Sequence, residues 1–254
     1  MALKNGDFIL ADYTLKIKET AETVGTTLES VAKDSKLYRG EERYEPFFII
    51  VGEGWVPKGL DEALTGFEVG KATTIELPPD KGYGVRDPKK VRLVPLRKFT
   101  AEGIAPVSGL QVNLDGKAAQ VRSVGAGRVQ VDYNHPFAGK TLIYDLTVVK
   151  TIETDEDKVR NLVHKRVPSV DLEKFGVRIQ ETRLEIEVPE DAFFLEGIQV
   201  AKRTITADVE KYLSMIGTVV FLETFKKPAA PAAKASPEPS AVQAVPQPTQ
   251  APTA

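Results

Sequence analysis

The stretch at residues 141–149 restricts the fold more than any other part of the sequence. It reads Thr-Leu-Ile-Tyr-Asp-Leu-Thr-Val-Val, and apolar character this continuous is typical of a strand buried along most of its length. The preceding residues 87–133 indicate a small all-β module, in which Asp115-Gly116 between two alternating runs predicts a hairpin turn. The strand at 141–149 has no obvious partner inside this module. The simplest arrangement pairs it with an earlier sheet, so the module interrupts a domain that continues after it.

The earlier sheet is expected within residues 7–85, where strand patterns occur three times and a short amphipathic helix once. The helix is expected at residues 60–64, with Gly59 opening it and Gly66 closing it. The strands are expected at residues 8–17, 47–51 and 73–77.

The region after residue 152 has a pattern of its own. Residues 155–167 carry apolar side chains at helical spacing, and residues 206–216 indicate a second helix with Thr206 as its N-cap. Strands are expected at residues 183–188 and 219–222. Helix, strand, helix and strand together predict a separate α+β domain.

The last residues, 227–254, are almost only Pro, Ala, Ser, Gln, Thr and Val. Such a segment buries too little apolar surface to offset its ordering entropy, which is roughly 1–2 kcal/mol per residue. We expect a disordered tail.

Composition excludes several kinds of site. The chain has no cysteine and two histidines, which excludes disulfides, a thiolate nucleophile and metal sites rich in cysteine or histidine. The net charge of −2 gives no overall basic field for nucleic acid. No segment approaches the roughly 18 consecutive apolar residues that span a bilayer, and the N-terminus lacks the apolar core of a signal peptide. We expect a cytoplasmic protein with no cofactor, no metal, and no nucleic-acid or membrane partner.

Three motifs carry a family resemblance. Residues 52–64 read Gly-Glu-Gly-Trp-Val-Pro-Lys-Gly-Leu-Asp-Glu-Ala-Leu, and residues 79–84 read Pro-Asp-Lys-Gly-Tyr-Gly. Residues 131–142 read Val-Asp-Tyr-Asn-His-Pro-Phe-Ala-Gly-Lys-Thr-Leu. The first two resemble the strand-to-helix segment and the active-site loop of FKBP-type peptidyl-prolyl isomerases. The third is similar to a signature of their SlyD-like branch, in which a β-rich insert-in-flap domain interrupts the loop near the active site.

The resemblance implies an α+β fold with four parts. An antiparallel FKBP sheet wraps on a short helix, and a small all-β domain is inserted into it. The C-terminal α+β domain resembles the extra domain of long archaeal members, and the disordered tail follows. The expected boundaries are 1–86 plus 134–152 for the isomerase domain, 87–133 for the insert-in-flap chaperone domain, 153–226 for the C-terminal domain and 227–254 for the tail.

The same resemblance implies seven catalytic pocket residues. Tyr83 corresponds to the family's hydroxyl donor to the substrate carbonyl, and Leu60 to the floor of the pocket. Isomerisation of an X-Pro bond has a barrier of about 20 kcal/mol from amide resonance. A water-poor apolar pocket with a few donors lowers this barrier without a nucleophile or a metal. The implied residues are Tyr13, Phe47, Val56, Pro57, Leu60, Tyr83 and Tyr144.

One departure from the family pattern concerns two substrate-binding positions. The family's F-D-T-T motif reads Val24-Gly25-Thr26-Thr27 here, so Val24 replaces a ring and Gly25 replaces a carboxylate. Reduced or altered isomerase activity is therefore one hypothesis.

Three functional hypotheses follow. In the first, the chain isomerises X-Pro bonds of unfolded or proline-containing polypeptides, and the insert holds these clients. In the second, it is a holdase chaperone with weak or lost isomerase activity. In the third, the C-terminal domain assembles the protein as a homodimer. The client-binding residues expected on the insert are Ile104, Val107, Leu110 and Val112.

Three further features were interpreted from the sequence. Trp55 is assigned either to an exposed rim that grips clients or to packing within its loop. His135, which precedes Pro136, is expected to stabilise a turn by a hydrogen bond to backbone. The basic run at residues 86–97 is expected to be a solvated strand edge rather than a nucleic-acid patch.

Overall fold

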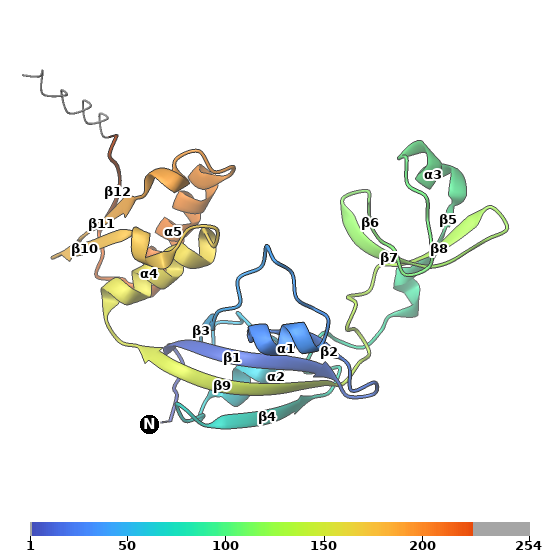
Figure 1. Cartoon of the computed structure of the whole chain (residues 1–254), viewed down its shortest axis with the longest axis horizontal. Coiled ribbons are helices and arrows are strands. Elements are labelled where there is room, and N and C mark those ends of the chain that lie inside the picture. The colour runs from blue at the N-terminus through green and yellow to red at the C-terminus, as the bar shows by residue number, and fades with distance from the viewer. Residues whose placement is uncertain (1, 226–254) are drawn as a thin grey trace, which may run out of the picture.

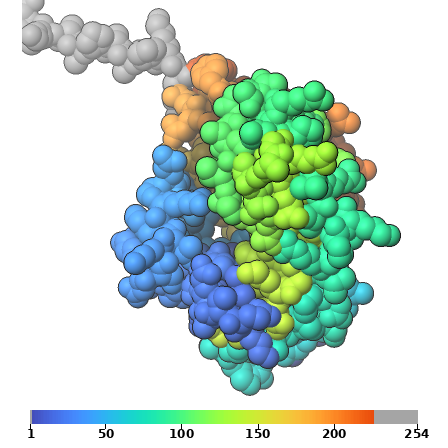
Figure 2. Space-filling model, turned by 90° about the vertical axis from the view of Figure 1, so that its right-hand side faces the viewer, coloured from blue at the N-terminus to red at the C-terminus, as the bar shows by residue number. Residues whose placement is uncertain are grey.

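The computed structural model describes residues 2–225, so the tail predicted at 227–254 lies outside the described residues. Figure 1 shows three parts: a sheet at the base, the C-terminal domain above one end of it and the insert above the other end. Figure 2, turned to the side, shows the green insert stacked over the blue and yellow-green strands of the base. The predicted α+β fold class is confirmed.

The base is a five-stranded antiparallel sheet with the order β2-β1-β9-β4, in which β3 also pairs with β1. The strand after the insert, β9, pairs with β1 from Leu142 to Ile152 and with β4 on its other side. The prediction that this late strand completes an earlier sheet is confirmed. The strands are β1 (Phe8–Ile17), β2 (Thr23–Thr26), β3 (Phe47–Ile50), β4 (Ala72–Leu77) and β9 (Leu142–Ile152).

Helix α2 (Lys58–Leu64) packs Leu60 and Leu64 into the core of this sheet, and α1 (Glu29–Asp34) follows β2. Gly59 does not open α2 as expected but is buried as its second residue. Its N–H donates to the Lys81 carbonyl at 2.9 Å, and a Cβ at Gly59 would lie 2.7 Å from the Lys81 Cβ. Glycine is therefore required because the loop at residues 78–84 approaches the helix backbone so closely.

The insert is a four-stranded sheet of order β5-β8-β7-β6 with its own core around Phe99. The predicted hairpin is confirmed: Leu114 pairs with Lys117, and Asp115 and Gly116 have φ values of 52° and 74°. The small helix α3 was not predicted. The elements are η1 (Pro88–Lys90), β5 (Val91–Pro95), α3 (Leu96–Ala101), β6 (Gln111–Leu114), β7 (Lys117–Gly125) and β8 (Arg128–Asp132).

Asp132 and Asn134 connect the segment that leaves the insert to the segment that enters it at residues 86–87. Asp132 is buried and forms ion pairs with Arg86 and Arg122, and the amide of Asn134 donates to the Asp87 carbonyl at 2.9 Å. Burial alone would raise the pKa of the Asp132 carboxyl, but hydrogen bonds from Asn134 and the two guanidinium groups hold it below its usual value. The basic run at 86–97 thus contributes η1, β5 and this junction.

In the C-terminal domain, the predicted helix at 206–216 is wrong in its boundaries. Helix α5 begins at Ile198, and Thr206 lies in its middle, where its hydroxyl donates to the Lys202 carbonyl at 3.0 Å instead of capping the helix. Ile198 packs into the domain core, which extends the helix upstream of the predicted start. The elements are α4 (Asp155–Arg166), η2 (Leu172–Lys174), β10 (Gly176–Gln180), β11 (Arg183–Val188), η3 (Glu190–Ala192), α5 (Ile198–Tyr212) and β12 (Thr218–Glu223).

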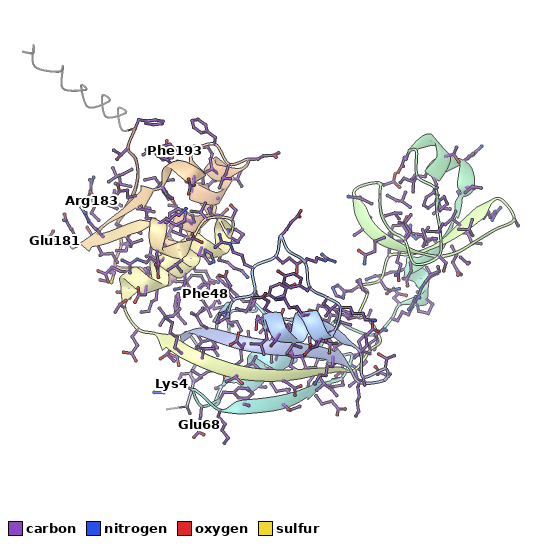
Figure 3. All side chains as sticks on the ribbon, in the orientation of Figure 1. Lys4, Phe48, Glu68, Glu181, Arg183 and Phe193 are labelled. Atoms are coloured by element: carbon purple, nitrogen blue, oxygen red, sulfur yellow. The ribbon has the colours of Figure 1, made fainter. Side chains whose placement is uncertain are left out.

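The C-terminal domain shares one apolar core with the end of the isomerase sheet. Figure 3 labels Phe48 at this junction, where its ring lies 5.3 Å from that of Trp55. The Trp55 indole donates to the Tyr212 hydroxyl at 3.2 Å, and Glu53 pairs with Lys211. The shared core joins Phe8, Phe48, Ile50 and Ile152 of the sheet to Val159, Leu162, Val163, Val209 and Leu213 of the C-terminal domain.

Candidate active site

Three aromatic side chains from three strands meet on the core side of the isomerase sheet. The Tyr13 ring of β1 lies 6.0 Å from that of Tyr144 on β9 and 6.1 Å from that of Phe47 on β3. Tyr144 is buried, whereas Tyr13 and Phe47 are half-buried at the edge of the same apolar cluster. Period-two strand geometry thus brings together residues that lie far apart in the sequence.

Residues from the segment before α2 and from α2 itself pack against the same apolar cluster as the three aromatic rings. Leu60 is 2% exposed and forms part of the apolar floor, and Val56 packs at its edge. Pro57 is half-buried at the start of α2, where its carbonyl accepts from the N–H groups of Leu60 and Asp61. The structure therefore brings Val56 and Leu60 to the cluster and gives Pro57 a helix-starting position beside it.

The loop that carries Val56 is held by Asp61, a buried carboxylate on α2. One oxygen accepts from the Gly52 N–H and the other from the Gly54 N–H, each at 2.8 Å. Both glycines have positive φ, of 84° and 70°. Asp61 thus fixes the shape of the chain immediately before Val56, a role that the sequence reasoning did not assign.

Tyr83 lies on the loop between β4 and the insert, and its ring packs against the same cluster. It stacks on His135 with ring centres 4.0 Å apart and planes 2° apart, and Phe137 lies edge-on at 5.5 Å. His135 also accepts from the Phe137 N–H at 3.2 Å, which confirms the predicted hydrogen bond to backbone. Sequence reasoning missed both the stacking and the place of Phe137, because neither leaves a local pattern.

Burial shifts the pKa values of three groups at the cluster, Tyr13, Tyr144 and His135, toward their neutral forms. Burial raises the pKa of Tyr144, and the neighbouring Tyr83 hydroxyl adds to this; burial likewise raises the pKa of Tyr13. Burial lowers the pKa of His135, which favours its uncharged form near neutral pH. The cluster therefore offers tyrosine hydroxyls as donors within an apolar surface.

Val24 and Gly25 lie on β2, next to this cluster. Val24 packs against it, and Gly25 pairs with Leu15 of β1. A Cβ at Gly25 would lie 3.9 Å from Cε2 of Tyr13, which is ordinary van der Waals contact. The structure thus places Val24 against the cluster and Gly25 beside Tyr13, where they contribute no carboxylate.

The four client-binding residues expected on the insert do not form one exposed patch. Val107 is 60% exposed, but Val112 is only 9% exposed and belongs to the core of the insert. Ile104 and Leu110 pack against that core. Val112 packs in the same core as Phe99, so little of its side chain is exposed, and client binding by these four residues stays a prediction.

A groove of about 490 Å³ lies instead between the insert sheet and the segment that leads to His135. It was not predicted, because it joins β6 and β7 to the chain beyond β8. Its lining includes Gln111, Val112, Ala118, Gln120, His135 and Pro136.

Trp55 is packed at the junction with the C-terminal domain, which decides between its two interpretations in favour of packing. Across residues 2–225, no group of three potential metal-ligating side chains is close enough to hold an ion. None of the described helices has the length and apolar character needed to cross a membrane.

Comparison with known proteins matches three stretches of the chain to family models. Residues 1–110 match the model for "FKBP-type peptidyl-prolyl cis-trans isomerase", residues 92–137 match "FKBP26, IF domain" and residues 155–226 match "FKBP26_C-terminal". The match to the isomerase model stops within the insert, as expected where an insertion separates β9 from the rest of the sheet.

Similar proteins carry isomerase names. A short-type peptidyl-prolyl cis-trans isomerase of Methanocaldococcus jannaschii is 36% identical over 146 residues, which cover 58% of this chain and 92% of that protein. The FKBP-type 16 kDa isomerase of Escherichia coli is 28% identical over 59% of this chain and 93% of its own. The FKBP-type isomerase SlyD of Helicobacter pylori is 32% identical over 120 residues, which cover 45% of this chain and 64% of that protein. The chain is therefore an enzyme that acts on proline-containing polypeptides, and it belongs to the family of FKBP-type peptidyl-prolyl cis-trans isomerases.

Proposed function

We propose that isomerisation takes place in the apolar cluster beneath Tyr83. The observation that supports this proposal is the convergence of side chains from separate segments on one apolar surface that includes the hydroxyl-bearing rings of Tyr13, Tyr83 and Tyr144. A twisted amide is less dipolar than a planar one, so an apolar surface with one well-placed donor favours the transition state. The pocket residues are Tyr13, Phe47, Val56, Leu60, Tyr83 and Tyr144, with Pro57 at the start of the adjoining helix.

Tyr83→Phe tests the assigned donor. Losing one hydrogen bond of about 1 kcal/mol lowers kcat/KM on a proline tetrapeptide about three- to tenfold. Cis-to-trans exchange measured by NMR gives the rate. Tyr38→Phe is the matched control, because Tyr38 is exposed and stacks on Tyr44 away from the cluster. Equal rates for the two variants would contradict the proposal.

We further propose that Val24 and Gly25 lower the rate relative to a pocket with a ring and a carboxylate at these positions. A Cβ at Gly25 meets nothing closer than 3.9 Å, so the backbone there has room for the first atom of a side chain. The double variant Val24→Phe/Gly25→Asp is expected to isomerise the tetrapeptide faster than the natural sequence. An unchanged or lower rate in a folded variant would contradict this.

A second proposed function is the holding of unfolded polypeptides by the insert. The groove beside His135 supports it, because it leads from the insert sheet to the residue that stacks on Tyr83. Ala118→Glu places a charge in this groove, whereas Gln130→Glu places one on an exposed strand position outside it. Aggregation of an unfolded client is expected to increase with the first variant only. If both variants protect the client equally, the groove is not the binding surface.

Assembly through the C-terminal domain is supported by exposed apolar side chains. Phe194 is 89% exposed and Val200 is 70% exposed, and apolar side chains that gather in an exposed patch are typical of an interaction surface. We propose that they contribute to a homodimer interface. Light scattering is expected to give twice the chain mass for the natural protein and a monomer for Phe194→Asp/Val200→Asp; a monomeric natural protein would refute it. A cytoplasmic location and the absence of nucleic-acid partners stay predictions.

A further inference from the structure

A lysine of the C-terminal domain lies on the pocket wall of the isomerase domain. Lys165, near the end of α4, places its ammonium 4.0 Å from the centre of the Phe47 ring and 5.6 Å from that of Trp55. Phe47 in turn meets the Tyr13 ring edge-on at 6.1 Å. A positive charge from a different domain is therefore separated from the pocket by a single aromatic ring.

This charge has no carboxylate partner within residues 2–225. The residues on either side of it are paired: His164 contacts Glu45 at 2.6 Å, and Arg166 contacts Asp208 at 2.7 Å. Lys165 itself forms no ion pair in the described part of the chain, and its side chain is half-buried. Burial lowers the pKa of its ammonium, and the charge of Arg166 adds to this. Contact with two aromatic faces offsets part of the desolvation but leaves the charge uncompensated.

We propose that Lys165 is a specificity-determining residue of the isomerase, which selects substrates with an acidic side chain next to the X-Pro bond. The inference rests on the proposed pocket, because the charge acts on a peptide bound there. The ring-centre distances place the ammonium within about 10 Å of the Tyr13 ring, which is roughly one Debye length at 0.1 M ionic strength. The side chain of a substrate glutamate next to the proline extends over part of the distance between the Tyr13 ring and the Lys165 ammonium.

Two acids lie near Tyr13 or Lys165: Glu42, and Glu45, which contacts His164 beside Lys165. Glu42 lies near Tyr13, where its charge contributes to the raised pKa of that tyrosine, and it pairs with Arg39 at 3.0 Å. Of these charged groups, Lys165 is the cation that lies on the ring of Phe47 and forms no ion pair within residues 2–225. A unit charge at this distance, in a medium between protein and water, changes the rate for a charged peptide about two- to tenfold.

The test uses the full chain and tetrapeptides that carry Glu, Gln or Lys immediately before or after the proline. The natural protein is expected to isomerise a Glu peptide about two- to tenfold faster, in kcat/KM, than the matching Lys peptide at one of the two positions. Lys165→Met is expected to abolish this preference, Lys165→Glu to reverse it and Lys165→Arg to retain it. High salt is expected to weaken it. A purely structural role for Lys165 would change all peptides alike.

Lys158 provides the matched control. It also lies over an aromatic ring of the isomerase domain, 5.5 Å from the centre of Phe8, but Phe8 belongs to the shared core and not to the pocket. Lys158→Met is expected to leave the preference intact. If the natural protein catalyses the Gln peptide and its charge preference is absent or is the same in all Lys165 variants, this inference is wrong while the pocket stands. If the natural protein does not catalyse the Gln peptide, the proposed pocket fails and this inference fails with it.

Discussion

Replacement of Asp61 by Asn tests how the pocket loop is held. The carboxylate accepts from the Gly52 and Gly54 N–H groups at 2.8 Å each. An asparagine keeps one accepting oxygen but turns an NH₂ group toward the other N–H, so at least one of the two bonds is lost. Hydrogen bonds to charged acceptors contribute about 1.5–3 kcal/mol each. Because Gly52 and Gly54 are exposed and gain water in exchange, we expect a loss of about 2 kcal/mol of unfolding free energy.

The assay is thermal unfolding followed by the fluorescence of Trp55, the one tryptophan of the chain, which lies in the same loop. For a chain of this size, the expected loss lowers Tm by about 4–8 °C. Amide exchange at residues 52–54 is expected to accelerate, and kcat/KM to fall because Val56 is less firmly placed. Asp80→Asn is the control, since Asp80 is exposed in the neighbouring loop. If both variants unfold at the same temperature, Asp61 does not hold the loop.

Three further predictions follow from other contacts. A carboxyl with a lowered pKa stabilises the fold above its unfolded pKa of about 4 and loses this effect as the pH falls through the folded value. Asp132→Asn is therefore expected to accelerate amide exchange of the insert at pH 7, and the difference from the natural protein is expected to shrink as the pH falls below about 4. Tyr212→Phe removes the acceptor of the Trp55 indole and is expected to shift tryptophan emission and cost about 1 kcal/mol; unchanged emission would mean that the domains are not docked in solution. Gly59→Ala forces a Cβ to 2.7 Å from that of Lys81 and is expected to cost about 1–3 kcal/mol in denaturant unfolding, whereas the same change at exposed Gly40, which meets nothing within 4 Å, is expected to cost little.

Elements with strong periodic patterns were predicted well, and elements decided by tertiary packing were not. The strand at Phe8–Ile17 and the pairing of β9 with β1 follow from apolar patterns that local neighbours cannot satisfy. Helix α5 was misplaced because Thr206 has a good N-cap side chain, while burial of Ile198 against the domain core extends the helix by two turns. The preference of one residue type was outweighed by packing that the sequence does not display.

In the candidate site, too, some residues were expected from sequence motifs and others are brought together only by the fold. Tyr13, Phe47 and Tyr144 were expected from motifs and do meet in space, although their roles stay proposals. The stacking of His135 on Tyr83 and the contact of Lys165 with Phe47 join segments more than fifty residues apart, so no spacing predicts them. The alternation of apolar and polar residues also identified the apolar positions of the insert. It did not show which of them are buried around Phe99 of helix α3.

The central place of β9 has a consequence for synthesis on the ribosome. Lys16 on β1 pairs with Asp145 on β9, which lies 129 residues later in the chain. Because β1 needs β9 as its neighbour, the isomerase sheet cannot form completely until the chain up to β9 has been synthesised. The insert sheet finds all its strands within residues 91–132 and is free to form first. Once formed, it brings its two ends together and shortens the loop that β9 must close, which lowers the entropic cost of pairing with β1. A mutation that unfolds the insert is thus expected to delay folding of the isomerase domain without altering a single contact in its sheet.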